Sequence, residues 1–196
     1  MPVAMTAIIL TGGKNVRMGS NKAFLKIGEE RLIDRTIGIL RDVFTEIILV
    51  TNTPLEYLDL GVAVVTDVIK GKSALGGIYT GLLHASCEYV FVTACDMPFI
   101  RRDFIMHMVR QADGSADVIV PRVPEGFQPL HAIYSRRCLP RIKRLIDQDR
   151  LKITGFYEQS RMTVIPGHVI DSFEGGPRMF FNVNTPEDLS AIPLPD

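Results

Sequence analysis

The sequence predicts an α/β protein in which a mostly parallel, twisted sheet lies between two layers of helices. Short apolar segments alternate along the chain with segments of helical periodicity. Strands that alternate with helices in this way form parallel sheets covered on both faces. No internal repeat, linker or low-complexity stretch divides the 196 residues, which suffice for one domain. We therefore expect a single domain over residues 1–196.

The expected strands are short segments rich in β-branched residues, each closed by polar residues, glycine or proline. The segment 6–11 (TAIILT) runs into a pair of glycines, and the segment 89–98 (YVFVTACDMP) stops being apolar at Cys95 and Asp96. The other expected strands are 46–51, 62–67, 117–122 and 129–135.

Three segments between the strands have the apolar spacing of helices. Residues 32–43 combine an apolar face with a charged one. Residues 73–85 (SALGGIYTGLLHA) carry small residues, which would let a strand or a ligand approach a helix closely. Residues 139–148 are also expected to be helical. Near the end of the sequence, Thr185 is a typical N-cap with Asp188 as its N3 partner.

Polar groups follow several expected strands at their carboxyl ends. Ligands bind outside this edge in open α/β sheets, so we expect these groups to converge on one site. They are Thr11, Gly12 and Gly13 after the first strand, then Asn52, Asp67 and Asp96.

The stretch ILTGGKNVRMGSNK, residues 9–22, matches neither common phosphate-binding loop. A Walker A motif ends in Gly-Lys-Ser/Thr, whereas Gly19 is followed by Ser-Asn. The GxGxxG fingerprint cannot be aligned with GGKNVRMG. What remains is a strand, two glycines whose backbone amides could face an anion, and the charges of Arg17 and Lys22. These residues fit a phosphate cradle and a glycine-rich surface turn equally well.

Carboxylate and amide side chains supply further candidates. Asp96 ends a rigid strand, where one carboxylate together with substrate phosphates can hold Mg²⁺, and Asp67 stands in a similar position. Each could instead be a turn aspartate. Asn182 and Asn184 alternate around Val183, so both amides should point the same way from an extended segment. Turn-forming asparagines before a helix are the alternative.

Composition argues against several classes of function. Lys plus Arg equals Asp plus Glu at 22 each, which leaves no overall charge to attract nucleic acid or an anionic membrane. Three cysteines without CxxC spacing fit reduced thiols, and the four histidines form no HExxH motif. The first residues lack a basic region, and their apolar stretch is too short for a signal or a membrane span. We therefore expect a cytoplasmic protein.

Five motifs in order resemble those of the molybdenum cofactor guanylyltransferases. The first, LTGGKNVRMGSNK, is similar to the signature LxGGxxxRMGxxK of this family. The others are DVIKGKSALGGI, TACDMPFI, QPLHAIY and FNVNTPEDL, so the likeness spans nearly the whole chain. Related cytidylyltransferases usually carry Ala-Ala-Gly at positions 11–13 and Asp-x-Asp at 182–184, which favours the guanylyl branch. The chain departs from the family at Ser73 and Ala74, where Gly-Pro is common.

The resemblance implies a three-layer Rossmann-like domain of the nucleotide-diphospho-sugar transferase type. It also implies transfer of GMP from GTP to molybdenum-bearing molybdopterin with Mg²⁺ as cofactor, and possible contacts with molybdoenzymes or other cofactor-biosynthesis proteins. By the same resemblance, the nucleotide is held by backbone groups of Leu10, Thr11, Gly12 and Gly13, and Asn52 and Asp67 help with its base or ribose. The resemblance assigns Arg17 and Lys22 to the phosphates and Asp96 to Mg²⁺. It places Asn182 and Asn184 toward the pterin-side phosphate or the metal.

Three alternatives remain at this point. One is a related nucleotidyltransferase that uses CTP or a sugar-phosphate acceptor. Another is a protein that binds guanine nucleotide or the cofactor without catalysis. The third, a degenerate scaffold subunit, is disfavoured because Lys22 and Asp96 are both present.

Overall fold

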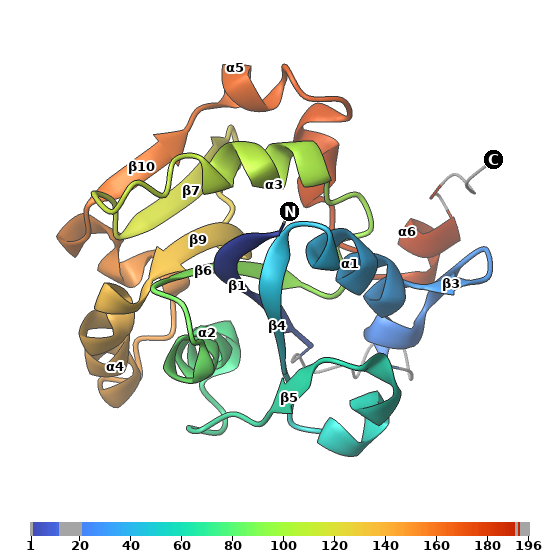
Figure 1. Ribbon diagram of the computed structural model, residues 1–196, viewed down its shortest axis with the longest axis horizontal. Coiled ribbons are helices and arrows are strands. Elements are labelled where there is room, and N and C mark those ends of the chain that lie inside the picture. The colour runs from blue at the N-terminus through green and yellow to red at the C-terminus, as the bar shows by residue number, and fades with distance from the viewer. Residues whose placement is uncertain (1, 12–20, 191, 193–196) are drawn as a thin grey trace.

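The structure is a computed structural model, and it describes residues 2–11, 21–190 and 192. Within them a twisted sheet lies between two layers of helices (Figure 1). The strands are β1 (Val3–Leu10), β2 (Lys26–Ile27), β3 (Glu30–Arg31), β4 (Phe44–Val50), β5 (Ala63–Val65), β6 (Tyr89–Ala94), β7 (Val118–Val123), β8 (Gly126–Phe127), β9 (His131–Ser135) and β10 (Met162–Ile165). The helices are α1 (Leu32–Arg41), α2 (Ser73–His84), α3 (Arg102–Val109), α4 (Leu139–Asp147), α5 (Gly167–Ile170) and α6 (Pro186–Ser190). Short 3₁₀ helices span Lys22–Phe24, Pro54–Leu60, Arg136–Cys138, Ile153–Gln159 and Gly176–Phe180.

The sheet is mostly parallel, as the sequence predicts. Its strand order is β10-β7-β9-β6-β1-β4-β5, with β8 paired to β7. The pairs β5·β4, β4·β1, β1·β6 and β7·β10 are parallel, whereas β9 runs antiparallel to β6 and β7. The strands β2 and β3 form a separate antiparallel pair.

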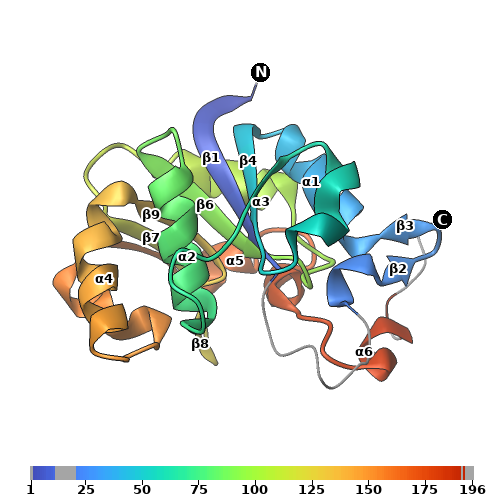
Figure 2. The same cartoon turned by 90° about the horizontal axis from the view of Figure 1, so that it is seen from below.

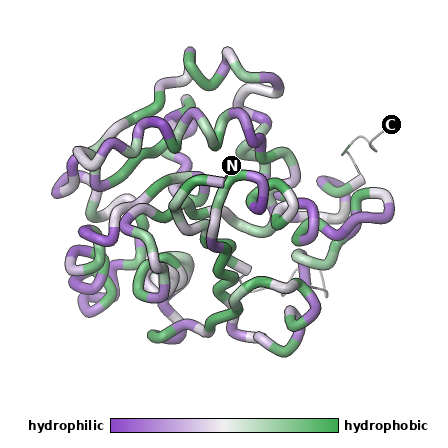
Figure 3. The backbone as a smooth tube through the Cα atoms, in the orientation of Figure 1, coloured by the Kyte–Doolittle hydropathy of each residue, from purple (hydrophilic) through white to green (hydrophobic). Residues whose placement is uncertain are grey.

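Two apolar cores cover the two faces of the sheet, because side chains alternate along each strand. Ala7 and Ile9 of β1 pack on the side of α1 and α3, and Ile8 and Leu10 pack on the side of α2 and α4. Seen from below, α2 and α4 lie in front of the sheet (Figure 2). Hydrophobic stretches run along the central strands, and hydrophilic stretches lie mainly at the periphery (Figure 3).

The glycines of α2 allow the close approach that the sequence predicts. A Cβ on Gly81 would stand 2.2 Å from Cδ1 of Ile8, and one on Gly77 would stand 3.0 Å from Cδ2 of Leu10. Real Cβ atoms essentially never show the first of these distances. The small residues of this helix therefore serve packing against β1.

Other predicted elements are present with small shifts of their boundaries. β1 begins at Val3 rather than at residue 6, and α2 ends one residue before the predicted position. The capping box before α6 is confirmed: the Asp188 amide donates to Thr185 Oγ1 over 3.1 Å, and the Thr185 amide donates to Asp188 Oδ2 over 2.9 Å. The sequence interpretation did not include α3 or β10.

The strand ends align at one edge of the sheet. Leu10 pairs with Val50 and with Ala94, and Val50 pairs with Val65, so the last residues of β1, β4, β5 and β6 form a row. The polar residues that follow these strands start from this row, as expected. No helix among the described residues is long and apolar enough to cross a membrane.

Candidate active site

Lys22, Asp96 and Asn184 meet at the carboxyl edge of the sheet, although they are distant in the sequence. The Lys22 ammonium donates a hydrogen bond of 2.9 Å to Oδ1 of Asn184, and its Nζ lies 3.6 Å from Oδ2 of Asp96. The Lys22 and Asp96 side chains are 17% and 20% exposed, so both remain accessible to a ligand. A cation, a carboxylate and an amide are thus held together at one place.

Local structure explains how the three side chains are brought together. Lys22 begins a 3₁₀ helix, and Asp96 lies two residues after the end of β6. The Val183 amide donates to the backbone oxygen of Asp96 over 2.9 Å, and the Val183 side chain is fully buried. This anchor fixes the segment that carries Asn184. The Asn184 amide in turn donates to the Asp188 carboxylate over 2.8 Å.

The electrostatics of Asp96 suit a site for cations. Burial raises the pKa of its carboxyl group, and the nearby Lys22 ammonium acts in the opposite direction. A cation that approached this carboxylate would offset the cost of burying its charge. The described residues contain no group of three or more His, Cys, Asp or Glu that could hold a metal. Asp96 would therefore need oxygen ligands from a substrate, which is how Mg²⁺ is commonly bound beside phosphates.

The neighbour of Asp96 is inert. Cys95 is 7% exposed, its backbone amide donates to the Leu10 carbonyl oxygen over 3.1 Å, and burial raises its pKa to about 12. A thiol with such a pKa is protonated at neutral pH and is a poor nucleophile. Cys95 therefore packs as a small buried hydrophobic residue.

A second pair of predicted residues, Asn52 and Asp67, meets at the same edge of the sheet. Asn52 Nδ2 donates to Oδ2 of Asp67 over 2.8 Å. The other carboxylate oxygen, Oδ1 of Asp67, is covered from solvent and has no hydrogen-bond partner among the described residues. A buried acceptor without a donor is costly. It could accept a hydrogen bond from a ligand, for which a ribose or a base has suitable groups.

The remaining predicted residues either serve other contacts or lie outside the described residues. The Leu10 carbonyl and the Thr11 amide are engaged with Cys95 and Val50, so these backbone groups complete the sheet. Asn182 Nδ2 donates to the Phe180 carbonyl over 3.2 Å, which matches the turn interpretation. Gly12, Gly13 and Arg17 lie outside the described residues. The roles that the resemblance implies for all six residues stay predictions.

Two residues next to the site were not singled out from the sequence. Asn21 Nδ2 donates to the Tyr57 hydroxyl and to Oε2 of Glu56, each over 2.7 Å. Burial raises the pKa of Tyr57, whereas hydrogen bonds with Thr11 and Asn21 act in the opposite direction. The available signal was a polar residue directly before Lys22 in the first motif, together with a tyrosine in the otherwise apolar and acidic run PLEYLDL.

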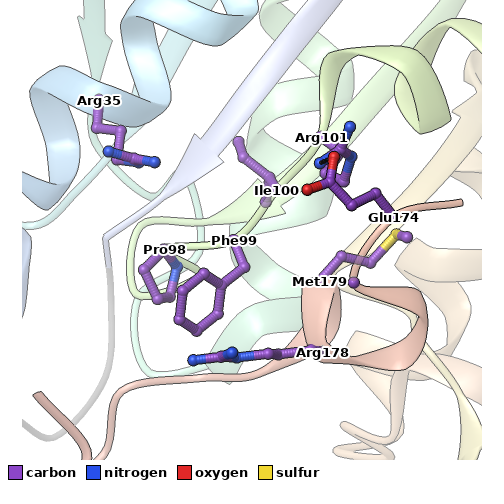
Figure 4. Close-up of a pocket in the computed structure, with 9 residues that line it drawn as sticks. Arg35, Pro98, Phe99, Ile100, Arg101, Glu174, Arg178 and Met179 are labelled. Carbon is purple, nitrogen blue, oxygen red and sulfur yellow. Dashed lines mark hydrogen bonds and ion pairs between the residues drawn. The ribbon is translucent and has the colours of Figure 1, made fainter. Parts of the chain in front are cut away.

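A cavity of about 230 Å³ lies close to the site (Figure 4). Its lining comes from α1, from the segment after Asp96 and from the segment before Asn182: Arg35, Pro98, Phe99, Ile100, Arg101, Glu174, Gly175, Arg178 and Met179. Its charges are largely matched within the protein. Arg101 pairs with Asp103 and Glu174, and the Arg178 guanidinium lies 4.4 Å from the ring centre of Phe99. Of the predicted site residues that the structure describes, none lines this cavity.

The chain is similar over most of its length to a known domain family and to proteins of that family. A family model described as "MobA-like NTP transferase domain" matches residues 7–162. The molybdenum cofactor guanylyltransferase of Desulfosudis oleivorans is 37% identical over 187 residues, which cover 95% of this chain and 93% of that protein. The probable molybdenum cofactor guanylyltransferase of Pelotomaculum thermopropionicum is 39% identical over 184 residues, covering 94% and 89%. The crystal structure of molybdopterin-guanine dinucleotide biosynthesis protein A from Archaeoglobus fulgidus matches with a TM-score of 0.82 and 25% identity, covering 94% of this chain and 95% of that chain.

Proposed function

The chain belongs to the family of MobA-like NTP transferase domains, and from this membership we propose that it is a molybdenum cofactor guanylyltransferase. In this proposal it transfers GMP from GTP to the terminal phosphate of molybdenum-bearing molybdopterin and releases pyrophosphate. The relatives that carry this name match over most of their own length and most of this chain. The identification of the acceptor and of the nucleotide therefore rests on these relatives, and the assignment of roles to residues rests on the geometry of the site.

The meeting of Lys22, Asp96 and Asn184 at the carboxyl edge of the sheet is the observation that carries the proposal. We assign Lys22 to the phosphates of the nucleotide and Asp96 to the metal. Asn52 and Asp67 would contact the ribose or the base, because the free Asp67 oxygen can accept a hydrogen bond from either. Asn184 would lie toward the phosphate of the acceptor.

The chemistry requires charge neutralisation more than acid–base catalysis. An oxygen of the acceptor phosphate attacks the α-phosphorus of GTP, a new P–O bond forms, and the bond between that phosphorus and the β-phosphate oxygen breaks. The second pKa of a phosphate monoester is about 6, so the attacking oxygen is already anionic at neutral pH. The principal difficulty is repulsion between two anions. A lysine held beside the reacting phosphates reduces this repulsion and stabilises the pyrophosphate as it leaves.

The residues present fit a bound Mg²⁺. Asp96 supplies one accessible carboxylate, and Asn184 supplies an amide oxygen next to the same ammonium group. One or two protein oxygens together with substrate phosphates are the usual ligands of Mg²⁺ in nucleotide sites. When bound, the ion would stabilise negative charge on the phosphates. Asp96 would then hold the triphosphate through the cation, and Lys22 would contact its phosphates directly.

Pyrophosphate release tests the proposal. The protein is supplied with Mg²⁺ and with GTP, CTP, ATP or UTP, in the presence and absence of purified molybdenum-bearing molybdopterin. We expect release only with GTP and acceptor together. More efficient turnover with CTP or UTP would overturn the nucleotide assignment, and GTP binding without pyrophosphate release would favour a binding protein.

The substitution Asp96→Asn tests the assignment of the metal ligand. It preserves the shape of the side chain but removes its charge, and we expect kcat/KM to fall about 100-fold or more. The fold should persist, because burial of this carboxylate is unfavourable and its raised pKa reflects that cost. Asp103→Asn is the matched control, since Asp103 on α3 pairs with Arg101 and is not among the assigned residues. Unchanged turnover in Asp96→Asn would remove Asp96 from the mechanism.

A further inference from the structure

We propose that Tyr57 and Asn21 are positioning residues that hold Lys22 in place against Asp96 and Asn184. The effect that we expect on the reaction rate rests on the proposed function. The geometry that the inference describes does not rest on it. Neither side chain is assigned a contact with substrate. Their effect would act through the orientation of the lysine.

The Tyr57 hydroxyl connects two stretches of chain that are separate in the sequence. Tyr57 is 1% exposed and belongs to the 3₁₀ helix Pro54–Leu60. Its hydroxyl accepts a hydrogen bond of 2.7 Å from Nδ2 of Asn21. The hydroxyl thus joins this 3₁₀ helix to the residue before Lys22.

Asn21 makes three side-chain hydrogen bonds, and two of them require the N–H donors of an amide. One N–H of its side chain donates to Tyr57 and the other donates to Oε2 of Glu56. Its Oδ1 accepts the amide of Ala23 over 3.1 Å and so caps the 3₁₀ helix that Lys22 begins. An aspartate could serve as the cap but could not donate to Glu56. It would instead place a second carboxylate beside the first.

This cap leads directly to Lys22. Ala23 is fully buried, and the ring of Phe24 stacks on Tyr57 with 5.1 Å between ring centres. Phe24 is therefore packed on the same tyrosine that holds Asn21, and Ala23 is hydrogen-bonded to Asn21 itself. The lysine backbone lies between these anchors, and its side chain reaches Asn184 over 2.9 Å. Loss of the Asn21 amide or of the Tyr57 hydroxyl should therefore make the Lys22 side chain less firmly positioned against Asn184.

Four variants and a control test the inference. Tyr57→Phe keeps the ring that stacks on Phe24 but removes the hydroxyl. Asn21→Asp introduces repulsion with Glu56, and in the double variant Asn21→Asp/Glu56→Gln the glutamine can donate to the new carboxylate. Glu56→Gln alone completes the double-mutant cycle. Tyr89→Phe is the control, because the Tyr89 hydroxyl donates to the Ala116 carbonyl over 2.7 Å at the opposite end of β6.

Chemical reactivity provides a readout that does not depend on turnover. The rate of Lys22 acetylation by acetic anhydride is measured by mass spectrometry relative to that of Lys143 on α4. We expect the ratio to rise severalfold in Tyr57→Phe and Asn21→Asp, to return toward the wild-type value in the double variant, and to stay unchanged in Tyr89→Phe. An unchanged ratio in Tyr57→Phe and Asn21→Asp would overturn the inference.

Kinetics then connect the geometry with the reaction. A misplaced catalytic group can cost about 100-fold, so we expect kcat/KM to fall about 10- to 100-fold in Tyr57→Phe and Asn21→Asp and to recover mostly in the double variant. Failure of the folded double variant to recover would contradict the role of the amide. If the wild-type protein releases no pyrophosphate with any nucleotide, the proposed function fails, and the acetylation ratios still decide whether Tyr57 and Asn21 position Lys22.

Discussion

The buried histidine His131 should make the protein less stable as the pH falls below about 6.5. The side chain is 0% exposed at the start of β9, and neither ring nitrogen has a hydrogen-bond partner among the described residues. The rings of Phe91, Phe104 and Phe180 surround it, with 5.0 to 5.7 Å between ring centres. Burial lowers its pKa to about 3.

The sign and the size of the effect follow from these values. Below pH 6.5 the unfolded chain binds a proton at His131 that the folded protein does not bind, so acid favours unfolding. Between pH 7 and pH 5 the free energy of unfolding should fall by about 2 kcal/mol from this residue alone. Below about pH 3 the folded protein binds the proton as well, and no further loss arises here.

The substitution His131→Met isolates this contribution. Methionine is apolar and adapts to irregular spaces, so it should fill the space among the phenylalanines. Removal of two buried nitrogens without partners should stabilise the protein at pH 7 by about 1 to 3 kcal/mol. Urea unfolding followed by far-UV circular dichroism, at pH 7 and at pH 5, gives the free energies. His107→Met on α3 is the control, and it should retain the pH dependence that arises from His131. Equal losses between pH 7 and pH 5 in wild type and His131→Met would refute the reasoning.

Three further substitutions test the packing and the charges of the fold. Ser73 has a φ of 54°, so Ser73→Gly should relieve left-handed strain and raise stability by about 0.5 to 1 kcal/mol in urea unfolding, net of the entropy of glycine. Gly81→Ala should lower stability by about 1 to 3 kcal/mol in urea unfolding, because its Cβ would overlap Ile8. A Cβ on Gly38 of α1 meets nothing within 4 Å, so Gly38→Ala should be neutral or stabilising in the same measurement. Asp117 is 1% exposed, and its bonds to arginines, Arg161 first, hold its pKa at about 2. The stability that it contributes is present above pH 4 and lost between pH 4 and pH 2. Asp117→Asn should therefore cost about 2 kcal/mol at pH 7 and flatten the acid limb of the unfolding curve.

Periodicity and strand ends carried most of the fold prediction. The run TAIILT and the run YVFVTA are apolar because both faces of their strands are covered, and such runs are visible in a single sequence. Helix α3 was also visible in principle, since Phe104, Ile105 and Met108 have helical spacing and are fully buried. The direction of β9 was not visible, because an apolar strand has the same pattern whether it pairs parallel or antiparallel.

The candidate site was predictable in part for a similar physical reason. Asn52, Asp67 and Asp96 each follow a strand, and parallel strands bring their carboxyl ends to one edge. The contacts of Tyr57 depend instead on how a loop folds back over this edge. No local pattern encodes the distance between the Tyr57 hydroxyl and the Asn21 amide, so this link had to come from the structure.

The titratable groups of the site bear on the class of acceptor. Among the described residues, the ionisable side chains in contact with Asp96 or Asn184 are Lys22 and Asp188. Hydrogen bonds from the backbone amides of Asn184 and Thr185 hold the pKa of Asp188 low, which makes it a weak base. An alcohol acceptor would need a base to remove its proton, whereas a phosphate acceptor arrives ionised at neutral pH. With Asp96 assigned to the metal and Asp67 to the nucleotide, neither carboxylate is left to act as this base, so the proposed arrangement fits a phosphate as the attacking group.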